Sequence, residues 1–291
     1  MSQSNDVPAI VNTVEELRRA VQAARQKGQS IGFVPTMGAL HEGHRSLIRA
    51  ATKQCDTIVV SIFLNPTQFG ENEDLDKYPR TLNEDLAACQ EEGARIVFCP
   101  PVAEVYSDNA TTIVDVQGLS QILEGESRPT HFRGVTTIVL KLFNMVQPDT
   151  AFFGQKDYQQ HAVIQRMVDD LDIPVEIVLC PTVREQDGLA MSSRNRFLSD
   201  EDREAALKLP LALNEARTRL TADAESDIDS IVQRITKRLD IDKQVALDYF
   251  TIVDPQTLQP IKTAQPVQVA LIAATVGETR LIDNMIIRKE D

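Results

Sequence analysis

The chain has 291 residues, 42% of them hydrophobic and 25% charged, so it is long enough to bury a core without disulfides or a structural metal. Its 30 basic residues are outnumbered by 43 acidic ones, which gives a net charge of −13. This balance disfavours nucleic acid as a partner, because phosphate backbones are bound by clustered positive charge. No apolar run approaches the ~18 residues of a membrane helix, so we expect no membrane partner.

The amino-terminal residues and the cysteines both favour a cytoplasmic protein. Residues 1–6 are polar and do not combine a basic segment with an apolar one, so no signal peptide is predicted. The four cysteines share no CxxC spacing and lie mostly in apolar runs: Cys55, Cys89, Cys99 and Cys180. We interpret them as reduced, buried thiols, which fits the cytosol.

The first part of the chain alternates predicted helices with predicted strands. Apolar runs predict strands over residues 31–34, 57–64 and 96–99. Helical spacing of apolar residues predicts helices over residues 14–26, from His44 onwards and over residues 82–92. This rhythm is typical of a Rossmann-like parallel sheet wound with helices, and hence of the α/β class.

The same rhythm continues with longer loops towards Pro181. Further strands are predicted over residues 113–116, 151–153 and 175–180, with helices over residues 135–146 and 158–171. Between them, residues 123–134 are interpreted as a loop. The helix over residues 135–146 is apolar on nearly all sides, which predicts that it is buried.

Beyond Pro181 the composition changes. Residues 183–196 are polar and are interpreted as a mobile loop, after which Ser199 caps a charged helix. A helix over residues 227–239 and strands over residues 247–253, 267–274 and 280–287 complete a smaller unit. We therefore predict two domains, residues 1–184 and an α+β domain of residues 185–291.

His41 and His44 flank Gly43 where a predicted strand runs into a predicted helix. The first N–H groups of a helix lack internal partners, so such a junction is a natural anion site, and a glycine lets a phosphate or a base approach the backbone. A metal pair and a purely structural pair are the alternatives. The zinc-protease signature requires a spacing of four, whereas these histidines are three apart.

No Walker sequence and no GxGxxG is present. Instead, His-x-Gly-His followed much later by Met-Ser-Ser-Arg resembles the HIGH and KMSKS pair of the superfamily that contains class I aminoacyl-tRNA synthetases and small nucleotidyltransferases. Five motifs extend the likeness: PTMGALHEGH at 35–44, FLNPTQF at 63–69, YPRT at 78–81, FGQKDYQQ at 153–160 and DGLAMSSRN at 187–195. In this order they resemble the pantoate–β-alanine ligase family. Glu42 and Arg194 depart from HIGH and KMSKS but match this family.

The resemblance implies a ligase that works in two steps. ATP and pantoate would form pantoyl adenylate and pyrophosphate, and the amine of β-alanine would then displace AMP to give pantothenate, a precursor of coenzyme A. ATP chemistry implies Mg²⁺, for which Asp85 is a weak candidate ligand by its position in the family. The family also implies a homodimer, and a smaller C-terminal domain that acts as a lid over a cleft.

The resemblance also assigns residues. His44 is the expected proton donor, and the catalytic set is His44, His41, Lys156 and Arg194. ATP would contact Met37, Gly38, Ala39, Leu40, His41, Glu42, Gly43, His44, Gly154, Gln155, Lys156, Asp157, Val183, Met191, Ser192, Ser193 and Arg194. Gln68 and Gln160 would bind pantoate, and Gln68 also β-alanine. His131 and Arg133 receive no definite role.

Three other functions remain open from the residues. A nucleotide-binding regulator without catalytic activity would use the same fold, but the histidine pair and the cations Lys156 and Arg194 favour an enzyme. A nucleotidyltransferase acting on a phosphate ester is a second enzymatic alternative. A tRNA-charging enzyme is disfavoured by the net charge and the short chain.

Overall fold

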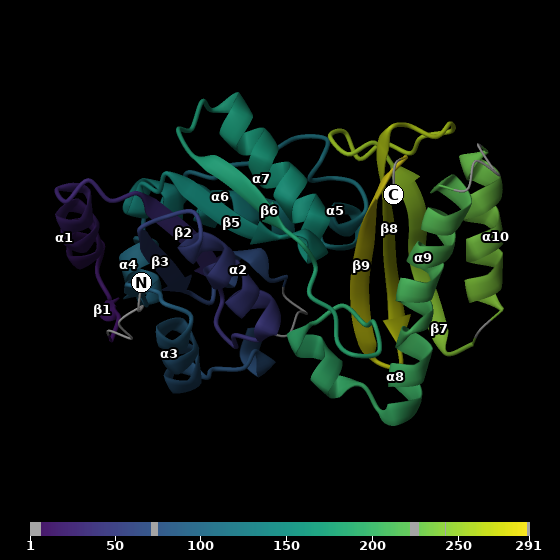
Figure 1. The fold of residues 1–291 in the computed structure, drawn as a ribbon, viewed down its shortest axis with the longest axis horizontal. Coiled ribbons are helices and arrows are strands. Elements are labelled where there is room, and N and C mark those ends of the chain that lie inside the picture. The colour runs from purple at the N-terminus through teal and green to yellow at the C-terminus, as the bar shows by residue number, and fades with distance from the viewer. Residues whose placement is uncertain (1–6, 71–74, 222–226, 242, 290–291) are drawn as a thin grey trace. The chain divides into compact units, whose positions relative to one another are not determined.

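The computed structural model describes residues 7–70, 75–221, 227–241 and 243–289 (Figure 1). The chain forms two compact units: the first contains Met1–Gly154 and Val163–Pro181, and the second contains Gln155–Ala162 and Thr182–Asp291. The sequence suggested a boundary between residues 184 and 185, close to the one at Pro181. It did not suggest that residues 155–162 pack with the second unit.

A six-stranded parallel sheet forms the centre of the first unit, in the order β1-β4-β3-β2-β5-β6. Its strands are β1 (Ala9–Val11), β2 (Ile31–Thr36), β3 (Thr57–Ile62), β4 (Ile96–Phe98), β5 (Thr150–Gly154) and β6 (Glu176–Cys180). Both β2 and β3 are buried nearly throughout, as their uninterrupted apolar runs predicted. The Rossmann-like α/β class is confirmed, while β1 was not predicted from its three residues.

Helices connect these strands: α1 (Val14–Arg25), α2 (Glu42–Thr52), α3 (Leu82–Glu91), α4 (Val102–Val105), α5 (Glu124–Ser127), α6 (His131–Val146) and α7 (Tyr158–Asp170). Three short 3-10 turns lie among them: η1 (Pro66–Gln68), η2 (Leu75–Lys77) and η3 (Gln155–Asp157). The start of α1 is a capping box, in which Thr13 and Glu16 each accept a backbone N–H of the other.

Two predictions for the region before α6 were wrong. Residues 113–116 are not a strand, because side chains of α6 bind their backbone: the Val114 N–H donates to Thr137 Oγ1 (2.9 Å), and Thr136 Oγ1 donates to the Val114 carbonyl (2.6 Å). Helix α6 begins at His131, earlier than predicted, so residues 123–134 contain α5 and the first turn of α6.

The second unit contains an antiparallel three-stranded sheet in the order β7-β8-β9, with β7 (Val245–Val253), β8 (Val267–Val276) and β9 (Thr279–Arg288). Its helices are α8 (Asp200–Ala206), α9 (Lys208–Thr221) and α10 (Ile228–Asp240), and η4 (Ser193–Phe197) precedes them. Apolar residues of α9 and α10, such as Leu213 and Ile235, share one core with Phe250 and Ile272 of the sheet. The predicted α+β composition is confirmed.

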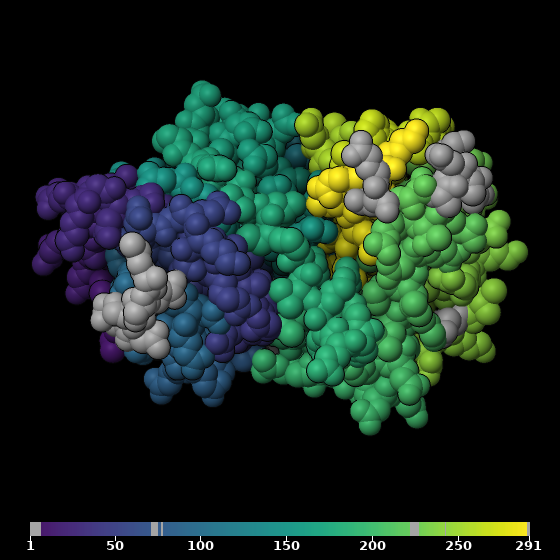
Figure 2. Space-filling model, in the orientation of Figure 1, coloured from purple at the N-terminus to yellow at the C-terminus, as the bar shows by residue number. Residues whose placement is uncertain are grey.

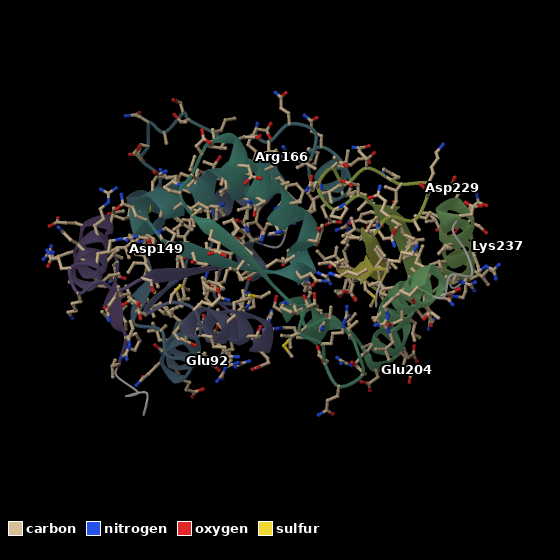
Figure 3. All side chains as sticks on the ribbon, turned by 45° about the horizontal axis from the view of Figure 1, so that its top comes forward. Glu92, Asp149, Arg166, Glu204, Asp229 and Lys237 are labelled. Carbon is tan, nitrogen blue, oxygen red and sulfur yellow. The ribbon has the colours of Figure 1, made fainter. Side chains whose placement is uncertain are left out.

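Two helices of the first unit, α2 and α3, present neighbouring surfaces (Figure 2). Glu92, at the end of α3, joins them (Figure 3): its side chain is only 8% exposed and accepts hydrogen bonds from Arg45 (2.6 Å) and Arg49 (2.8 Å) of α2. This ion-pair network fixes the helix that begins at the histidine pair. Among the described residues, every helix is too short or too polar to span a lipid bilayer.

Candidate active site

The chain turns sharply after β2. Gly38 and Ala39 both have positive φ angles, +85° and 51°, the left-handed region that favours glycine. A Cβ on Gly38 would lie 3.1 Å from Asp85 Oδ2. Asp85, on α3, is 2% exposed and accepts the N–H groups of Ala39 (3.0 Å) and Leu40 (2.7 Å). The turn therefore depends on a residue far away in sequence.

The two histidines cap α2 together. His41 is the residue before the first turn, and its Nδ1 accepts the Gly43 N–H at 3.1 Å. His44 Nδ1 accepts the His41 N–H at 3.4 Å, and the ring centroids are 4.1 Å apart. This is the geometry of a capping box, with histidines in place of the usual Ser or Thr and Glu.

These contacts determine where each ring carries its proton. A nitrogen that accepts a backbone N–H is unprotonated, so a neutral His41 or His44 carries its hydrogen on Nε2. Each ring can therefore offer Nε2–H to an anion without giving up its bond at the helix start. The structural alternative and the anion-site alternative are thus compatible: one nitrogen of each ring caps the helix, and the other is a donor.

Gly43 has a steric role. A Cβ at this position would lie 2.8 Å from Cε1 and 2.9 Å from Nδ1 of His41, closer than real Cβ contacts allow. Because Gly43 has no side chain, the His41 ring has room to lie over the first turn of α2. The sequence suggested a different reason, close approach of a ligand. Glu42 turns away to pair with Arg49 on the same helix.

Gln68 lies in η1, the loop that leaves β3, and is 8% exposed. Its Nε2 is 2.7 Å from Met37 Sδ, so the structure does bring these two predicted site residues together. Its carbonyl oxygen accepts His131 Nδ1–H at 2.9 Å and faces Arg128 Nη2 at 3.5 Å. His131, which had no assigned role, therefore holds the main chain of Gln68.

Asn65 and Gly134 support this loop, and the sequence did not single them out. Asn65 is 1% exposed and donates to Gln68 Oε1 (3.1 Å) and to the Gly134 carbonyl (3.2 Å). Its Oδ1 accepts the Tyr106 hydroxyl at 2.9 Å, and burial raises the pKa of Tyr106, which keeps it a donor. A Cβ on Gly134 would lie 2.4 Å from the Thr67 carbonyl oxygen. In the sequence, only its position in the motif at 63–69 pointed to Asn65 as a residue of the site.

In the second unit, Asn284 of β9 anchors the segment that carries Lys156. Its side-chain amide donates to the carbonyls of Gln155 and Lys156, both at 2.8 Å, and accepts from Gln155 Nε2 at 3.2 Å. Asn284 is 2% exposed. These bonds explain why residues 155–162 pack with this unit. The Lys156 side chain is 21% exposed, and Gln160 lies in the first turn of α7.

Residues 183–191 form a hairpin, whereas the sequence suggested a mobile loop. The Met191 N–H donates to the Val183 carbonyl (2.9 Å), and the Glu185 N–H donates to the Leu189 carbonyl (2.8 Å). Arg184 makes a two-point ion pair with Asp283 of β9, at 2.7 and 3.0 Å. The polar composition of this segment therefore does not mean mobility, because a charged residue such as Arg184 is held in an ion pair.

Arg203 of α8 clamps this hairpin. Its guanidinium contacts Glu185 (2.6 Å) and Asp187 (2.7 Å), and these bonds raise the pKa of Arg203. The same Glu185 accepts from Asn195, which also donates to the Ala190 carbonyl at 3.0 Å. Ser192 Oγ accepts the Arg194 N–H at 3.3 Å and so caps η4. The predicted ATP-binding residues 191–194 are held from both ends.

We therefore expect Arg203→Ala to raise the KM for ATP severalfold and leave the KM for the acid substrate unchanged. Without Arg203, the hairpin would lose its ion pairs at Glu185 and Asp187. The ATP-binding residues 191–194, which follow it, would then be held less firmly. Steady-state kinetics measure both constants, and Arg217→Ala, an exposed arginine of α9, is the matched control. Equal changes in both constants, or no change in either, would contradict this prediction.

The predicted site residues divide between the two units. The first unit holds Met37, Gly38, Ala39, Leu40, His41, Glu42, Gly43, His44, Gln68, Asp85 and Gly154. The second holds Gln155, Lys156, Asp157, Gln160, Val183, Met191, Ser192, Ser193 and Arg194.

The described residues offer no cluster of side chains for a bound metal ion. Among the described residues, no group of three His, Cys, Asp or Glu side chains could hold a metal ion. The Nδ1 atoms of His41 and His44 already accept backbone N–H groups, which argues against the metal-pair alternative. Both oxygens of Asp85 likewise accept backbone N–H groups.

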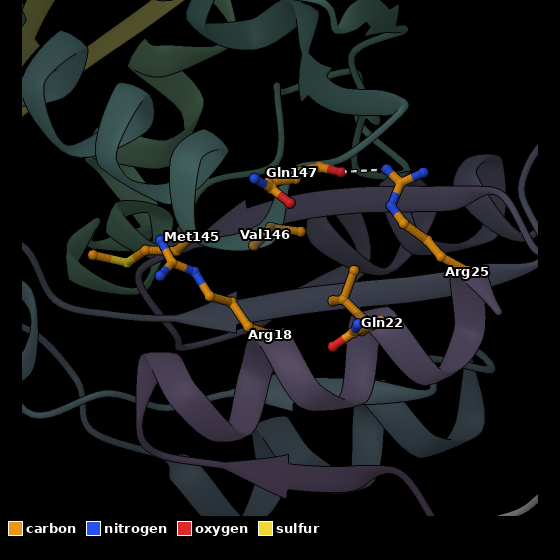
Figure 4. Close-up of a pocket in the computed structure, with 7 residues that line it drawn as sticks. Arg18, Gln22, Arg25, Met145, Val146 and Gln147 are labelled. Carbon is orange, nitrogen blue, oxygen red and sulfur yellow. Dashed lines mark hydrogen bonds between the residues drawn. The ribbon is translucent and has the colours of Figure 1, made fainter.

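A separate cavity of about 500 Å³ lies between α1 and the end of α6 (Figure 4). It is lined by Arg18, Val21, Gln22, Arg25, Met145, Val146 and Gln147. Arg25 is already bound to the Gln147 carbonyl (2.6 Å) and Asp149 (3.0 Å). Because Gln147 precedes β5, the cavity is at the amino end of that strand, whereas ligands of parallel sheets bind at the carboxyl ends.

The four cysteines are free thiols, as predicted, but only Cys89 and Cys180 are buried, whereas Cys55 and Cys99 are half-buried. Burial raises the pKa of Cys89 from 9.0 to about 12 and that of Cys99 to about 11. We expect Cys89 to react slowly with DTNB at pH 8 in the folded protein and fast after unfolding. Because the folded pKa values are raised, the free energy of unfolding should fall as pH rises above 9. Fast labelling of Cys89 in the folded state would contradict this.

Comparison with known proteins agrees with these motifs. The family model for pantoate-beta-alanine ligase matches residues 9–286. The pantothenate synthetase of Moorella thermoacetica is 49% identical over 282 residues, covering 97% of this chain and 99% of that protein.

Solved structures are similar as well. A pantothenate synthetase from Thermus thermophilus superposes with a TM-score of 0.90 at 44% identity, covering 95% of this chain and 98% of that one. The pantoate-beta-alanine ligase of Francisella tularensis, solved with beta-gamma ATP and beta-alanine, has a TM-score of 0.78 at 33% identity and 98% coverage of both chains. This chain belongs to the pantoate–β-alanine ligase family.

Proposed function

We propose that this protein condenses pantoate with β-alanine at the expense of ATP, giving pantothenate, AMP and pyrophosphate. The observation that supports it most is the relationship to pantothenate synthetases over nearly the whole chain. The homologue that binds beta-gamma ATP and beta-alanine supports the two substrates. The histidine pair and the two predicted phosphate cations supply the chemistry that such a reaction needs.

In the first step, a carboxylate oxygen of pantoate attacks the α-phosphorus of ATP, and the bond to the bridging oxygen of pyrophosphate breaks. Negative charge grows on the α-phosphate and on the departing pyrophosphate, so donors held in place lower the barrier. We assign this role to the Nε2–H groups of His41 and His44, with His44 as the proton donor. Lys156 and Arg194 supply positive charge to the phosphates.

In the second step, the neutral amine of β-alanine attacks the carbonyl carbon of pantoyl adenylate, AMP leaves with one oxygen from pantoate, and the nitrogen loses a proton to solvent as the amide forms. We assign pantoate binding to Gln68 and Gln160, and β-alanine binding to Gln68. Neutral amides suit a carboxylate that must lose its charge. Gln68 is supported for this task because Asn65 and His131 hold it on two sides.

The remaining assignments follow from the family. We propose that ATP also contacts residues 37–44, and Gly154, Gln155, Asp157, Val183 and residues 191–193. Mg²⁺ would arrive bound to the ATP phosphates, since the described residues offer no cluster for it. We further propose a cytoplasmic homodimer, to be tested by light scattering against the chain mass of 32.4 kDa.

The reaction products test the proposal. Incubation with ATP, β-alanine and pantoate labelled with ¹⁸O in its carboxylate should give equal amounts of AMP, pyrophosphate and pantothenate. Mass spectrometry should find one ¹⁸O atom in AMP, which requires an acyl adenylate. ADP as the product would reject the mechanism, and ATP binding without turnover would favour a regulator.

A further inference from the structure

The carboxylate of Asp85 is buried inside the first unit and bound on both of its oxygens. Oδ1 accepts the Leu40 N–H at 2.7 Å, Oδ2 accepts the Ala39 N–H at 3.0 Å, and Thr81 Oγ1 lies 3.3 Å from each oxygen. Its exposure is 2%. Hydrogen bonds to a charged acceptor are about twice as strong as neutral ones.

This donor set does not suit a magnesium ligand. Mg²⁺ requires nearly octahedral oxygen ligands at about 2.0–2.1 Å and usually keeps several waters. A hydrated ion would need an open face of the carboxylate, whereas this one is covered by the backbone of residues 38–40. The position that the family resemblance offered for a metal is therefore filled by the protein itself.

The turn that Asp85 binds would not hold its shape alone. Ala39 has a φ of 51°, a conformation that is strained for any residue with a Cβ. Two consecutive N–H groups directed at one carboxylate offset that strain. The same turn leads directly into His41, whose backbone N–H must meet His44 Nδ1.

We infer that Asp85 is a positioning residue, which holds the turn of residues 38–40 in the left-handed conformation that sets the start of α2 and its histidines. It acts through the backbone rather than through Mg²⁺. This inference rests on the proposed function for its catalytic consequence, but its structural part is independent of any activity.

The decisive variant is Asp85→Asn, which keeps the size of the side chain but can accept at only one of its two positions. We expect hydrogen exchange of the Ala39 and Leu40 amides, followed by mass spectrometry, to become at least tenfold faster without any substrate. We expect kcat/KM for ATP to fall about 10–100-fold, the usual scale for a misplaced catalytic group. The Mg²⁺ concentration for half-maximal activity, at fixed MgATP, should not change.

Glu84→Gln is the matched control, because it removes one charge from the same turn of α3 at an exposed position. It should leave exchange and kinetics unchanged. Thr81→Val is a milder second variant, should Asp85→Asn fail to fold. It removes the hydroxyl beside both carboxylate oxygens, and we expect a smaller change of the same kind.

The outcomes separate the possibilities. Unchanged exchange of Ala39 and Leu40 in both Asp85→Asn and Thr81→Val would overturn the inference. A shifted Mg²⁺ requirement with normal exchange would identify Asp85 as a metal ligand and overturn it as well. Faster exchange in a protein whose wild type has no ligase activity would support the positioning role and reject the proposed function.

Discussion

His44→Ala is expected to lower kcat for pyrophosphate release about 10²–10⁴-fold, the scale of a positioned acid–base group, while the protein stays folded. The substitution removes the Nε2–H donor and also the acceptor of the His41 N–H. The second loss weakens the helix start by about 1 kcal/mol, too little to unfold a domain of this size. Pyrophosphate release from ATP and pantoate, without β-alanine, isolates the step concerned.

Two further variants separate capping from chemistry at this position. His44→Asn keeps an oxygen near Nδ1 that can accept the His41 N–H, but it places no donor near Nε2. His44→Gln places an amide nitrogen near Nε2. We expect His44→Asn to be as slow as His44→Ala, and His44→Gln to recover part of the rate. Near wild-type rates in His44→Asn would remove His44 from the mechanism.

Gly43→Ala is expected to lower kcat/KM for ATP about 10–100-fold, although it adds only one methyl group. That methyl would lie 2.8 Å from Cε1 of His41, so the ring must rotate away and give up its bond to the residue 43 N–H. Alanine otherwise favours a helix over glycine, so the melting temperature should change little. Steady-state kinetics and thermal melting together check both parts.

A double-mutant cycle identifies the cause. If the clash with the ring produces the defect, Gly43→Ala should cost nothing more once the ring is absent. The double variant His41→Ala, Gly43→Ala should therefore be as active as His41→Ala alone. Additive losses would mean that Gly43 matters for ligand approach, which is the reason first suggested by the sequence.

Helix caps and buried strands, which depend on neighbouring residues, were predicted correctly from the sequence. Thr13 and Ser199 are helix caps because their hydroxyls bind N–H groups only three residues away. The buried strands of the parallel sheet were recognisable from their uninterrupted apolar runs. The prediction of a strand at residues 113–116 was wrong because the backbone of this segment binds the side chains of Thr136 and Thr137. These partners are more than 20 residues away in the chain, so the local sequence does not indicate them.

The positioning roles of Asp85 and Asn284 could not be predicted from the sequence, for the same reason. Asp85 is in the first turn of a helix, where an acidic residue needs no special explanation. Asn284 is within a strand, where it looks like an ordinary polar position. Each acts by binding the backbone of a segment far away in the chain, and only the folded structure pairs them. The family motifs contain Asn65 and Thr81, but they do not indicate that these residues hold others in place.

With the roles proposed for His41 and His44, the histidine cap of α2 would favour activity over thermal stability. Serine, aspartate and asparagine are the preferred caps, and natural chains are seldom at their stability optimum. A laboratory selection for heat resistance alone should therefore drift towards Ser or Asp in place of His41, and the survivors would be robust but inactive. Any stabilisation campaign on this fold should exclude residues 41–44 from its libraries and begin with the exposed ends of the other helices.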